Sequence, residues 1–301
     1  MKYDLLLIRH GELSLKTKWV RKQFESTLVR NIKHAFTTHN LSCTVEKEWG
    51  RIYLYTDKIQ EGKELLQRIF GVTSVSPVKK TTAEMDKISK LVVPFTKELL
   101  KKGDSFALRV TRTGRHRFTS QNVAIKIGDD IRTATGAPVD LTHPDVEIYI
   151  EIRNENAFLF VEKYRGTGGL PLGTQGKVVA LIDSPQSLLA SWYLMRRGCE
   201  ILFVTLNEQY IGVLEDFMSY WNAQSEVCSL PGGKQFYEKV NAITLKHRGD
   251  AIVTGHTIYS SAALTDIKQL KKHVSYPVLS PLIALEMNEI QSQCNEAGIP
   301  I

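Results

Sequence analysis

The chain has 301 residues, of which 43% are hydrophobic and 24% charged, the balance of an ordinary globular protein with room for two or three domains. No apolar run approaches the eighteen or so residues that a membrane-crossing helix needs, and "MKYDLLLIRHGE" is too soon charged for a signal peptide, so a cytoplasmic location without membrane contact is expected. The four cysteines stand far apart with no C-x-x-C pair, which argues against a zinc ribbon and a disulfide framework.

Positive charge is concentrated in the first part of the chain. The net charge is +7 overall, but residues 1–170 carry 29 Lys and Arg against 20 Asp and Glu, whereas residues 171–301 carry 10 against 12. Such a local excess favours a polyanionic partner for the first part of the chain. Phosphate backbones are the commonest partner of this kind.

Residues 1–75 predict a first α+β domain. The apolar strand "YDLLLIR" precedes a helix over 19–38, whose apolar positions recur at helical spacing. The alternating strand "RIYLYT" follows, and "GKELLQRIFG" reads as a short helix ending at Gly71.

Residues 76–165 predict a second, mixed domain. It comprises a helix over 86–101, the strand "FALRVTRT", a helix over 120–133 and the paired strands "VEIYIEIR" and "AFLFVEKY". The turn "NEN" joins the last two strands as a hairpin, with Ile148, Ile150 and Ile152 on one face.

The glycine-rich segment "RGTGGLPLGTQGK" has the composition of a linker, placed at residues 166–176. From 177 to 301, strands such as "VVALI", "EILFVTL" and "AIVTG" alternate with helices. This spacing predicts a parallel sheet covered on both faces, with a ligand site at the carboxyl ends of its strands.

Three stretches carry a resemblance to a known family: "FALRVTRTGRHRFTSQNVAIKIGDDI", "VDLTHPDVEIYIEIRNENAFLFVEKYRGTGGLPLGTQGK" and "AIVTGHTIYSSAALTDIKQL" with "YPVLSPLIALEMNEI". Together they resemble the tRNA 4-thiouridine synthetase (ThiI, tRNA sulfurtransferase) family. The resemblance implies an N-terminal ferredoxin-like domain, a THUMP domain and a PP-loop pyrophosphatase-like domain, one of the adenine nucleotide alpha hydrolase-like folds. It also implies that the first two domains grip the acceptor end of a tRNA while the third, with ATP and magnesium, adenylates a uridine for sulfur exchange. Members of the family often pair as homodimers.

The segment "RVTRTGRHR" has a density of guanidinium groups suited to phosphate oxygens. Together with the resemblance, it predicts RNA contacts at Arg109, Arg112, Arg115, Arg117 and, on the next helix, Lys126. A second basic group comprises Lys16, Lys18, Arg21 and Lys22, for which RNA contact and plain solvent exposure are equally good interpretations. His10 and His116 are expected to be structural.

The turn expected to hold nucleotide phosphates departs from the family pattern. Where the PP-loop has S-G-G-x-D-S, this chain has Asp183, Ser184, Pro185, Gln186, Ser187 and Leu188. Both glycines are lost, Pro185 removes an amide donor, and Asp183 brings a negative charge. The sequence therefore predicts a degenerate nucleotide loop that still caps a helix through Asp183 or Ser184.

Cys228 is the one candidate sulfur carrier, although an ordinary buried thiol is the commoner case. The glycine-containing "PGGK" at 231–234 is a weak anion motif and is expected to be an ordinary turn.

These features support three hypotheses. The leading one is a tRNA-binding protein linked to thiolation, whose degenerate domain docks a separate catalytic or sulfur-donor protein. The first alternative is an active ATP-dependent sulfurtransferase, with Asp183, Ser184 and Ser187 near magnesium-bound phosphates and with Cys228 as the sulfur carrier. The second is a nucleotide-sensing regulator of RNA binding.

Overall fold

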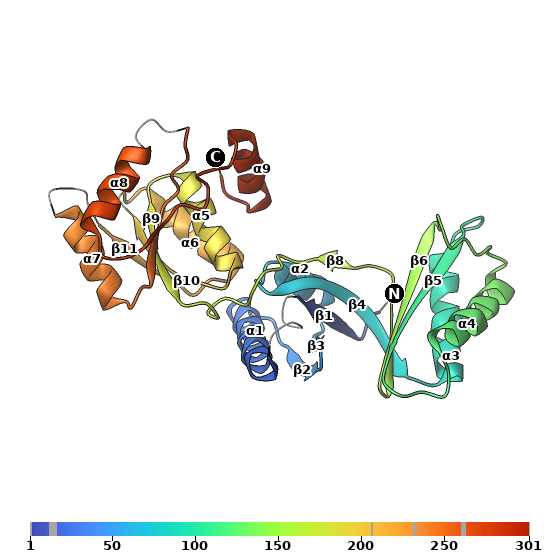
Figure 1. The fold of residues 1–301 in the computed structure, drawn as a ribbon. Coiled ribbons are helices and arrows are strands. Elements are labelled where there is room, and N and C mark those ends of the chain that lie inside the picture. The colour runs from blue at the N-terminus through green and yellow to red at the C-terminus, as the bar shows by residue number, and fades with distance from the viewer. Residues whose placement is uncertain are drawn as a thin grey trace. The chain divides into compact units, whose positions relative to one another are not determined.

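The computed structural model describes residues 2–11, 17–205, 207–230, 233, 235–259 and 263–300 (Figure 1). The chain divides into two compact units, neither of which is a single stretch of sequence. Unit 1 comprises Met1–Arg9, His39–Glu64 and Ser74–Arg165, and unit 2 comprises His10–Thr38, Leu65–Thr73 and Gly166–Ile301. No helix among the described residues has the length and apolar character needed to cross a membrane.

A mixed sheet runs through unit 1. Its strands are, in spatial order, β2 (Thr44–Glu48), β3 (Arg51–Tyr55), β1 (Leu5–His10), β4 (Val72–Thr82), β7 (Asn156–Phe160), β6 (Val146–Arg153) and β5 (Phe106–Thr113), with β8 (Tyr164–Arg165) paired to β4. The β5–β6 pair is parallel, and β6–β7 is the predicted antiparallel hairpin.

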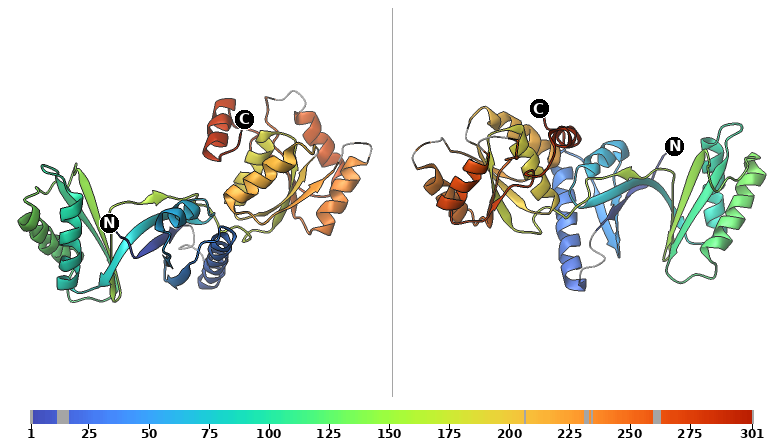
Figure 2. Two further views of the ribbon diagram at one scale, coloured as in Figure 1. Left: turned by 180° about the vertical axis from the view of Figure 1, so that it is seen from behind. Right: turned by 45° about the horizontal axis from the view of Figure 1, so that its top comes forward.

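Helices α3 (Met85–Leu99) and α4 (Ser120–Thr135) cover one face of the β5–β6–β7 part of this sheet (Figure 2). Ile148, Ile150 and Ile152 are buried in that core, which confirms the face predicted for them. Thr119 caps α4 by accepting a hydrogen bond from the Asn122 amide at 3.1 Å.

The sequence interpretation missed β2 and β4. β2 is mostly exposed and lacks a buried alternating face. β4 contains Pro77, which normally argues against a strand. Because β4 spans 72–82, it continues without a break across the predicted domain boundary at 75 and 76.

Unit 2 contains the predicted parallel sheet, which has five strands among the described residues; β11 was not predicted. Its order is β11 (Glu226–Ser229), β10 (Glu200–Thr205), β9 (Lys177–Ile182), β12 (Ala251–Val253) and β13 (Val278–Leu279). Its helices are α5 (Pro185–Arg196), α6 (Tyr210–Trp221), α7 (Phe236–Lys246), α8 (Ala263–His273) and α9 (Met287–Glu296).

Alternate residues of a strand point to opposite sides of a sheet, and helices bury both sides of this one. Helices α5, α6 and α9 cover one face of this sheet, and α7 and α8 cover the other (Figure 2). From β9, Ala180 and Ile182 join the first core, whereas Val179 and Leu181 join the second. The continuous apolar run "VVALI" is the sequence signature of this arrangement.

The remaining helices are α1 (Lys18–Thr38) and α2 (Ile59–Gln67). The glycine-rich segment after β8 is held by backbone hydrogen bonds: the Gly71 amide donates to the Gly168 carbonyl at 2.8 Å, and the Leu170 amide donates to the Arg196 carbonyl at 2.9 Å. A Cβ at Gly169 would lie 2.1 Å from that Arg196 oxygen, so this glycine serves a close backbone approach.

Candidate RNA interface and nucleotide cleft

The loop after β5 is anchored to the β6–β7 turn. Gly114 has a φ of +106°, and a Cβ there would lie 3.0 Å from the Asn154 side-chain oxygen. His116 Nε2 lies 2.7 Å from the Asn154 carbonyl, and Arg112 Nη1 lies 3.2 Å from His116 Nδ1. Because the guanidinium donates to Nδ1, the ring carries its proton on Nε2 and donates it to the carbonyl. Arg112 and His116 therefore shape the loop.

Arg115 and Arg117 lie on this anchored loop, and both are exposed. They line a hollow of about 440 Å³ together with Phe118 and Glu155. Neither has an ion pair with any residue that the structure describes. Their guanidinium groups are therefore available to phosphate oxygens.

Arg109 and Lys126 are differently placed. Arg109 Nη2 lies 2.7 Å from a Glu147 carboxylate oxygen, and Lys126 Nζ lies 2.5 Å from one of Asp130. The Lys126 ammonium, followed by the Ser89 hydroxyl, holds the pKa of Asp130 below its ordinary value. Arg109 and Lys126 are thus each paired with a carboxylate. In this they differ from Arg115 and Arg117, the exposed arginines of the predicted basic cluster.

The second basic group lies at the start of α1. Lys18 and Lys22 are exposed, and Arg21 is half-buried. Lys16 lies outside the described residues.

Three backbone amides of the turn between β9 and α5 are bonded within the turn itself. The Asp183 and Ser184 amides both donate to Ser187 Oγ at 3.2 Å, and Ser187 Oγ donates to the Ser184 carbonyl at 2.6 Å. The Ser187 amide donates to the same carbonyl at 3.1 Å. Ser184 is the N-cap residue, as one of the two predicted options had it, but the hydroxyl that binds the turn amides belongs to Ser187.

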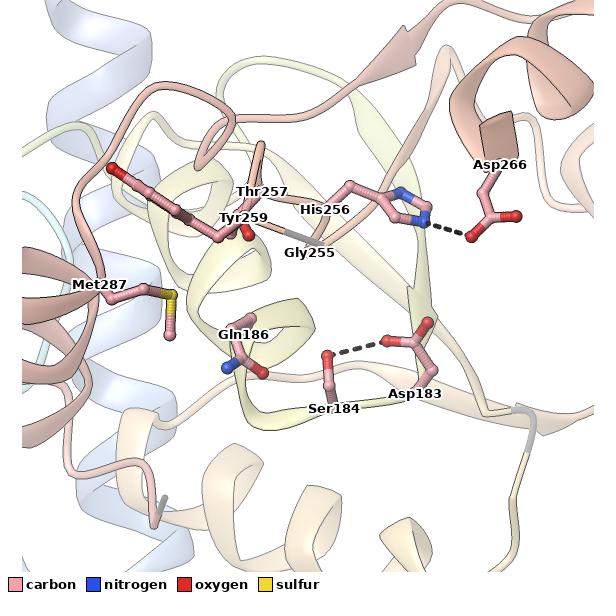
Figure 3. Close-up of a pocket in the computed structure, with 9 residues that line it drawn as sticks. All are labelled: Asp183, Ser184, Gln186, Gly255, His256, Thr257, Tyr259, Asp266 and Met287. Carbon is pink, nitrogen blue, oxygen red and sulfur yellow. Dashed lines mark hydrogen bonds and ion pairs between the residues drawn. The ribbon is translucent and has the colours of Figure 1, made fainter. Parts of the chain in front are cut away.

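A cleft of about 530 Å³ opens at the carboxyl ends of β9 and β12 (Figure 3). Its lining consists of Asp183, Ser184, Gln186, Gly255, His256, Thr257, Tyr259, Asp266 and Met287. None of these nine described residues is a lysine or an arginine. The Ser184 hydroxyl donates to the Asp183 carboxylate at 2.9 Å, and His256 Nε2 lies 3.7 Å from an Asp266 oxygen.

Gly255 sets how closely the two sides of this cleft approach. A Cβ at this position would lie 2.3 Å from the Ser187 nitrogen and 2.6 Å from its Cα. The segment just after β12 is therefore packed directly against the first turn of α5.

The cleft residues after β12 were missed at the sequence level. The segment "GHTIY", which directly follows a predicted strand, contains His256, Thr257 and Tyr259. Ligand sites in parallel sheets lie at the carboxyl ends of the strands, and this rule could have identified the segment. Asp266 and Met287 come from helices α8 and α9, distant in sequence.

Cys228 lies on the outermost strand β11, in register with Val204 of β10, and is half-buried. It does not line the described cleft. Three residues of the "PGGK" segment, Pro231, Gly232 and Lys234, lie outside the described residues. Within the described part of the chain, no group of three His, Cys, Asp or Glu side chains is arranged to hold a metal ion.

The domain content agrees with known families. The model of the ThiI ferredoxin-like domain matches residues 5–76, and that of the THUMP domain matches residues 82–162. The chain is thus a protein with ferredoxin-like and THUMP domains followed by a parallel α/β domain, which confirms the predicted fold class. It is 33% identical to a probable tRNA sulfurtransferase of Methanobrevibacter smithii, over 99% of this chain and 87% of that one. A probable tRNA sulfurtransferase of Methanothermobacter thermautotrophicus is 32% identical, over 98% and 85%. This chain belongs to the tRNA sulfurtransferase (ThiI) family.

Two solved structures share the fold. The structure of PH1313 from Pyrococcus horikoshii matches with a TM-score of 0.85 at 27% identity, covering 98% of this chain and 99% of that one. That of a 4-thiouridine synthetase–RNA complex with bound ATP matches with a TM-score of 0.83 at 23% identity, covering 99% and 86%.

The alignment with the Methanobrevibacter relative contains gaps in this chain. That alignment runs over 337 positions, so at least 36 of them have no counterpart in the 301 residues here.

Proposed function

We propose that this chain binds tRNA through its THUMP domain and serves tRNA thiolation without holding ATP in the manner of a PP-loop enzyme. One contrast carries the proposal: Arg115 and Arg117 are exposed without carboxylate partners among the described residues, whereas the lining of the cleft contains carboxylates and no lysine or arginine.

The RNA half of the proposal rests on the anchored loop and on the relatives. The relatives are named as tRNA sulfurtransferases, and one structure of the same fold holds RNA. Because Arg112 and His116 hold the loop in place, Arg115 and Arg117 meet a phosphate with little loss of backbone freedom.

The nucleotide half rests on the β9–α5 turn. A phosphate cradle needs several free backbone amides at a helix N-terminus, but those of Asp183, Ser184 and Ser187 are bonded within the turn and Pro185 has none. Among these described turn residues, only the Gln186 amide is left for a phosphate. A phosphate charge about 5 Å from the Asp183 carboxylate would also be repelled by roughly 3 kcal/mol at an effective dielectric constant of about 20.

A chain of this kind needs a separate catalytic or sulfur-donor protein for the chemistry. A cytoplasmic location and a homodimer remain predictions that accompany the proposal.

The RNA half is tested by tRNA binding at two salt concentrations. We expect log affinity to fall steeply against log salt, by up to about 0.9 per phosphate neutralised. The variant Arg115→Gln with Arg117→Gln should lower that slope by about 1.8. The matched control, Arg109→Gln with Lys126→Gln, removes the same charge from two paired cations and should change binding much less. Equal losses in the two variants would contradict the assignment.

The nucleotide half is tested by calorimetry with magnesium and ATP. We expect no binding in the range at which ATP-dependent enzymes work. Saturable binding with adenylate formation on tRNA would instead identify an active sulfurtransferase using Asp183, Ser184 and Ser187. Nucleotide binding that changes tRNA affinity without turnover would identify a regulator.

A further inference from the structure

Helix α1 has one buried face. The Val20 amide donates to the Thr17 hydroxyl at 3.4 Å, so Thr17 caps the helix at its first turn. The buried residues are Phe24, Leu28, Ile32, Ala35 and Phe36, which fall on one side of the helix at 100° per residue. Asn31 lies beside this buried face, and its side-chain amide donates to the Leu172 carbonyl at 3.0 Å.

The opposite face of α1 is basic. The exposed basic side chains are Lys18, Lys22, Arg30, Lys33 and His34, which the same helical geometry places in an arc of roughly 160°. The single acidic residue of the helix, Glu25, lies at the border of this arc, and its carboxylate is 3.9 Å from His10 Nε2. None of the four Lys and Arg side chains in the arc has a carboxylate partner among the described residues.

Trp19 lies near the centre of that arc. It is 71% exposed. Lys18 precedes it in the chain, and Lys22 lies about one helical turn further on. An isolated exposed apolar residue is ordinary on a protein surface. An exposed indole within a face of unpaired cations is the combination by which proteins hold single-stranded nucleic acid, since bases stack on the ring while the cations bind phosphates.

The far end of the basic face leads into a polar hollow of about 380 Å³. Arg30 and His34 line it, together with Asn222, Gln224 and Glu200, whose carboxylate lies 3.7 Å from Lys177 Nζ. Arg30 and Gln224 offer hydrogen-bond donors to sugar and phosphate oxygens at this end of the helix.

We propose that the outer face of α1 is a second RNA-binding surface, on which Trp19 stacks against an unpaired base of the bound tRNA while Lys18, Lys22, Arg30 and Lys33 hold the adjoining phosphates. The surface rests on the proposed function, because it assumes that tRNA is the partner. It belongs to unit 2, whereas Arg115 and Arg117 belong to unit 1.

Trp19 is tested by tRNA affinity and by tryptophan fluorescence. Trp192 and Trp221 are buried, so Trp19 and Trp49 are the exposed indoles. We expect tRNA to quench the fluorescence of the full chain, the quenching to be lost in Trp19→Phe, and to persist in the matched control Trp49→Phe. We also expect Trp19→Ala to weaken tRNA binding roughly tenfold, with Trp19→Phe retaining most of the affinity because a ring remains.

The cations are tested by Lys18→Gln with Lys22→Gln, which should lower the salt slope by about 1.4 if they contact a single strand. The control, Lys271→Gln with Lys272→Gln on α8, removes equal charge from the same unit and should leave the slope unchanged. Quenching that survives in Trp19→Phe, or unchanged affinity in Trp19→Ala, would overturn the surface. If Arg115→Gln with Arg117→Gln still weakens binding in that case, tRNA binding itself stands and only the role of α1 is lost.

Discussion

Replacing Glu151 by glutamine removes a carboxylate that three arginines of unit 1 share. Glu151 lies on β6, and its side chain is 7% exposed. Its oxygens lie 2.7 Å from Arg51 Nε, 3.3 Å from Arg9 Nη2 and 3.4 Å from Arg153 Nη1. Burial lowers the pKa of the Arg9 guanidinium, and the charge of Glu151 opposes that shift. The carboxylate therefore compensates cations that come from β1, β3 and β6.

The expected cost follows from burial. Removing one partner of a buried ion pair leaves uncompensated charge and costs about 3–5 kcal/mol. Glu147 lies on the same strand as Glu151 and pairs with Arg109 at 2.7 Å. The side chains of Glu147 and Arg109 are 37% and 36% exposed. Water screens that pair, so Glu147→Gln should cost less than about 1 kcal/mol and serves as the matched control.

Native-state hydrogen exchange at the amides of β6 and β7 measures this loss within unit 1. We expect protection to fall far more in Glu151→Gln than in Glu147→Gln. Adding Arg51→Gln to Glu151→Gln removes one of the excess cations and should restore part of the stability. Equal protection in the two single variants would refute the reasoning. So would a double variant that is clearly less stable than Glu151→Gln, because that loss would show that Arg51 was not an excess charge.

Three further outcomes concern stability. Ser187→Ala should lower the free energy of unfolding by about 1 kcal/mol, because the amides that bind its hydroxyl lose their acceptor; urea denaturation measures it, and an unchanged midpoint would contradict the turn geometry. Gly255→Ala should cost at least about 2 kcal/mol because its Cβ would overlap the Ser187 backbone, whereas Gly212→Ala in α6, with open space around it, should be neutral or stabilising in the same assay. The Ser105 amide and hydroxyl lower the pKa of Asp145, so this carboxylate stabilises the fold above its unfolded pKa and ceases to do so as the pH falls through its folded pKa. Wild-type protein should therefore lose more stability than Asp145→Asn between about pH 5 and 3. Equal falls in the melting temperatures of the two proteins over this range would contradict the prediction.

Much of the local structure follows from the sequence. The periodicity of residues 19–38 predicted α1 to within a residue, and "FALRVTRT" and "VEIYIEIR" predicted β5 and β6 at their observed bounds. Short-range patterns suffice there, because each element buries a face that its own spacing defines. β4 was missed because Pro77 argues locally against a strand, and its neighbours β1 and β7 come from distant parts of the chain.

Sequence alone determined the family, the parallel sheet of unit 2 and the absence of glycines from the β9–α5 turn, because each depends on residue types in order along the chain. Only the tertiary structure decided which cations are paired. Glu147 pairs with Arg109 from 38 residues away, whereas Arg115 and Arg117 form no ion pair among the described residues. The tertiary structure also decided that the Ser187 hydroxyl accepts hydrogen bonds from the turn amides and that Asp266 of α8 lines the cleft. Charge compensation and hydrogen-bond satisfaction depend on distance in space, and the order of residues does not specify that distance.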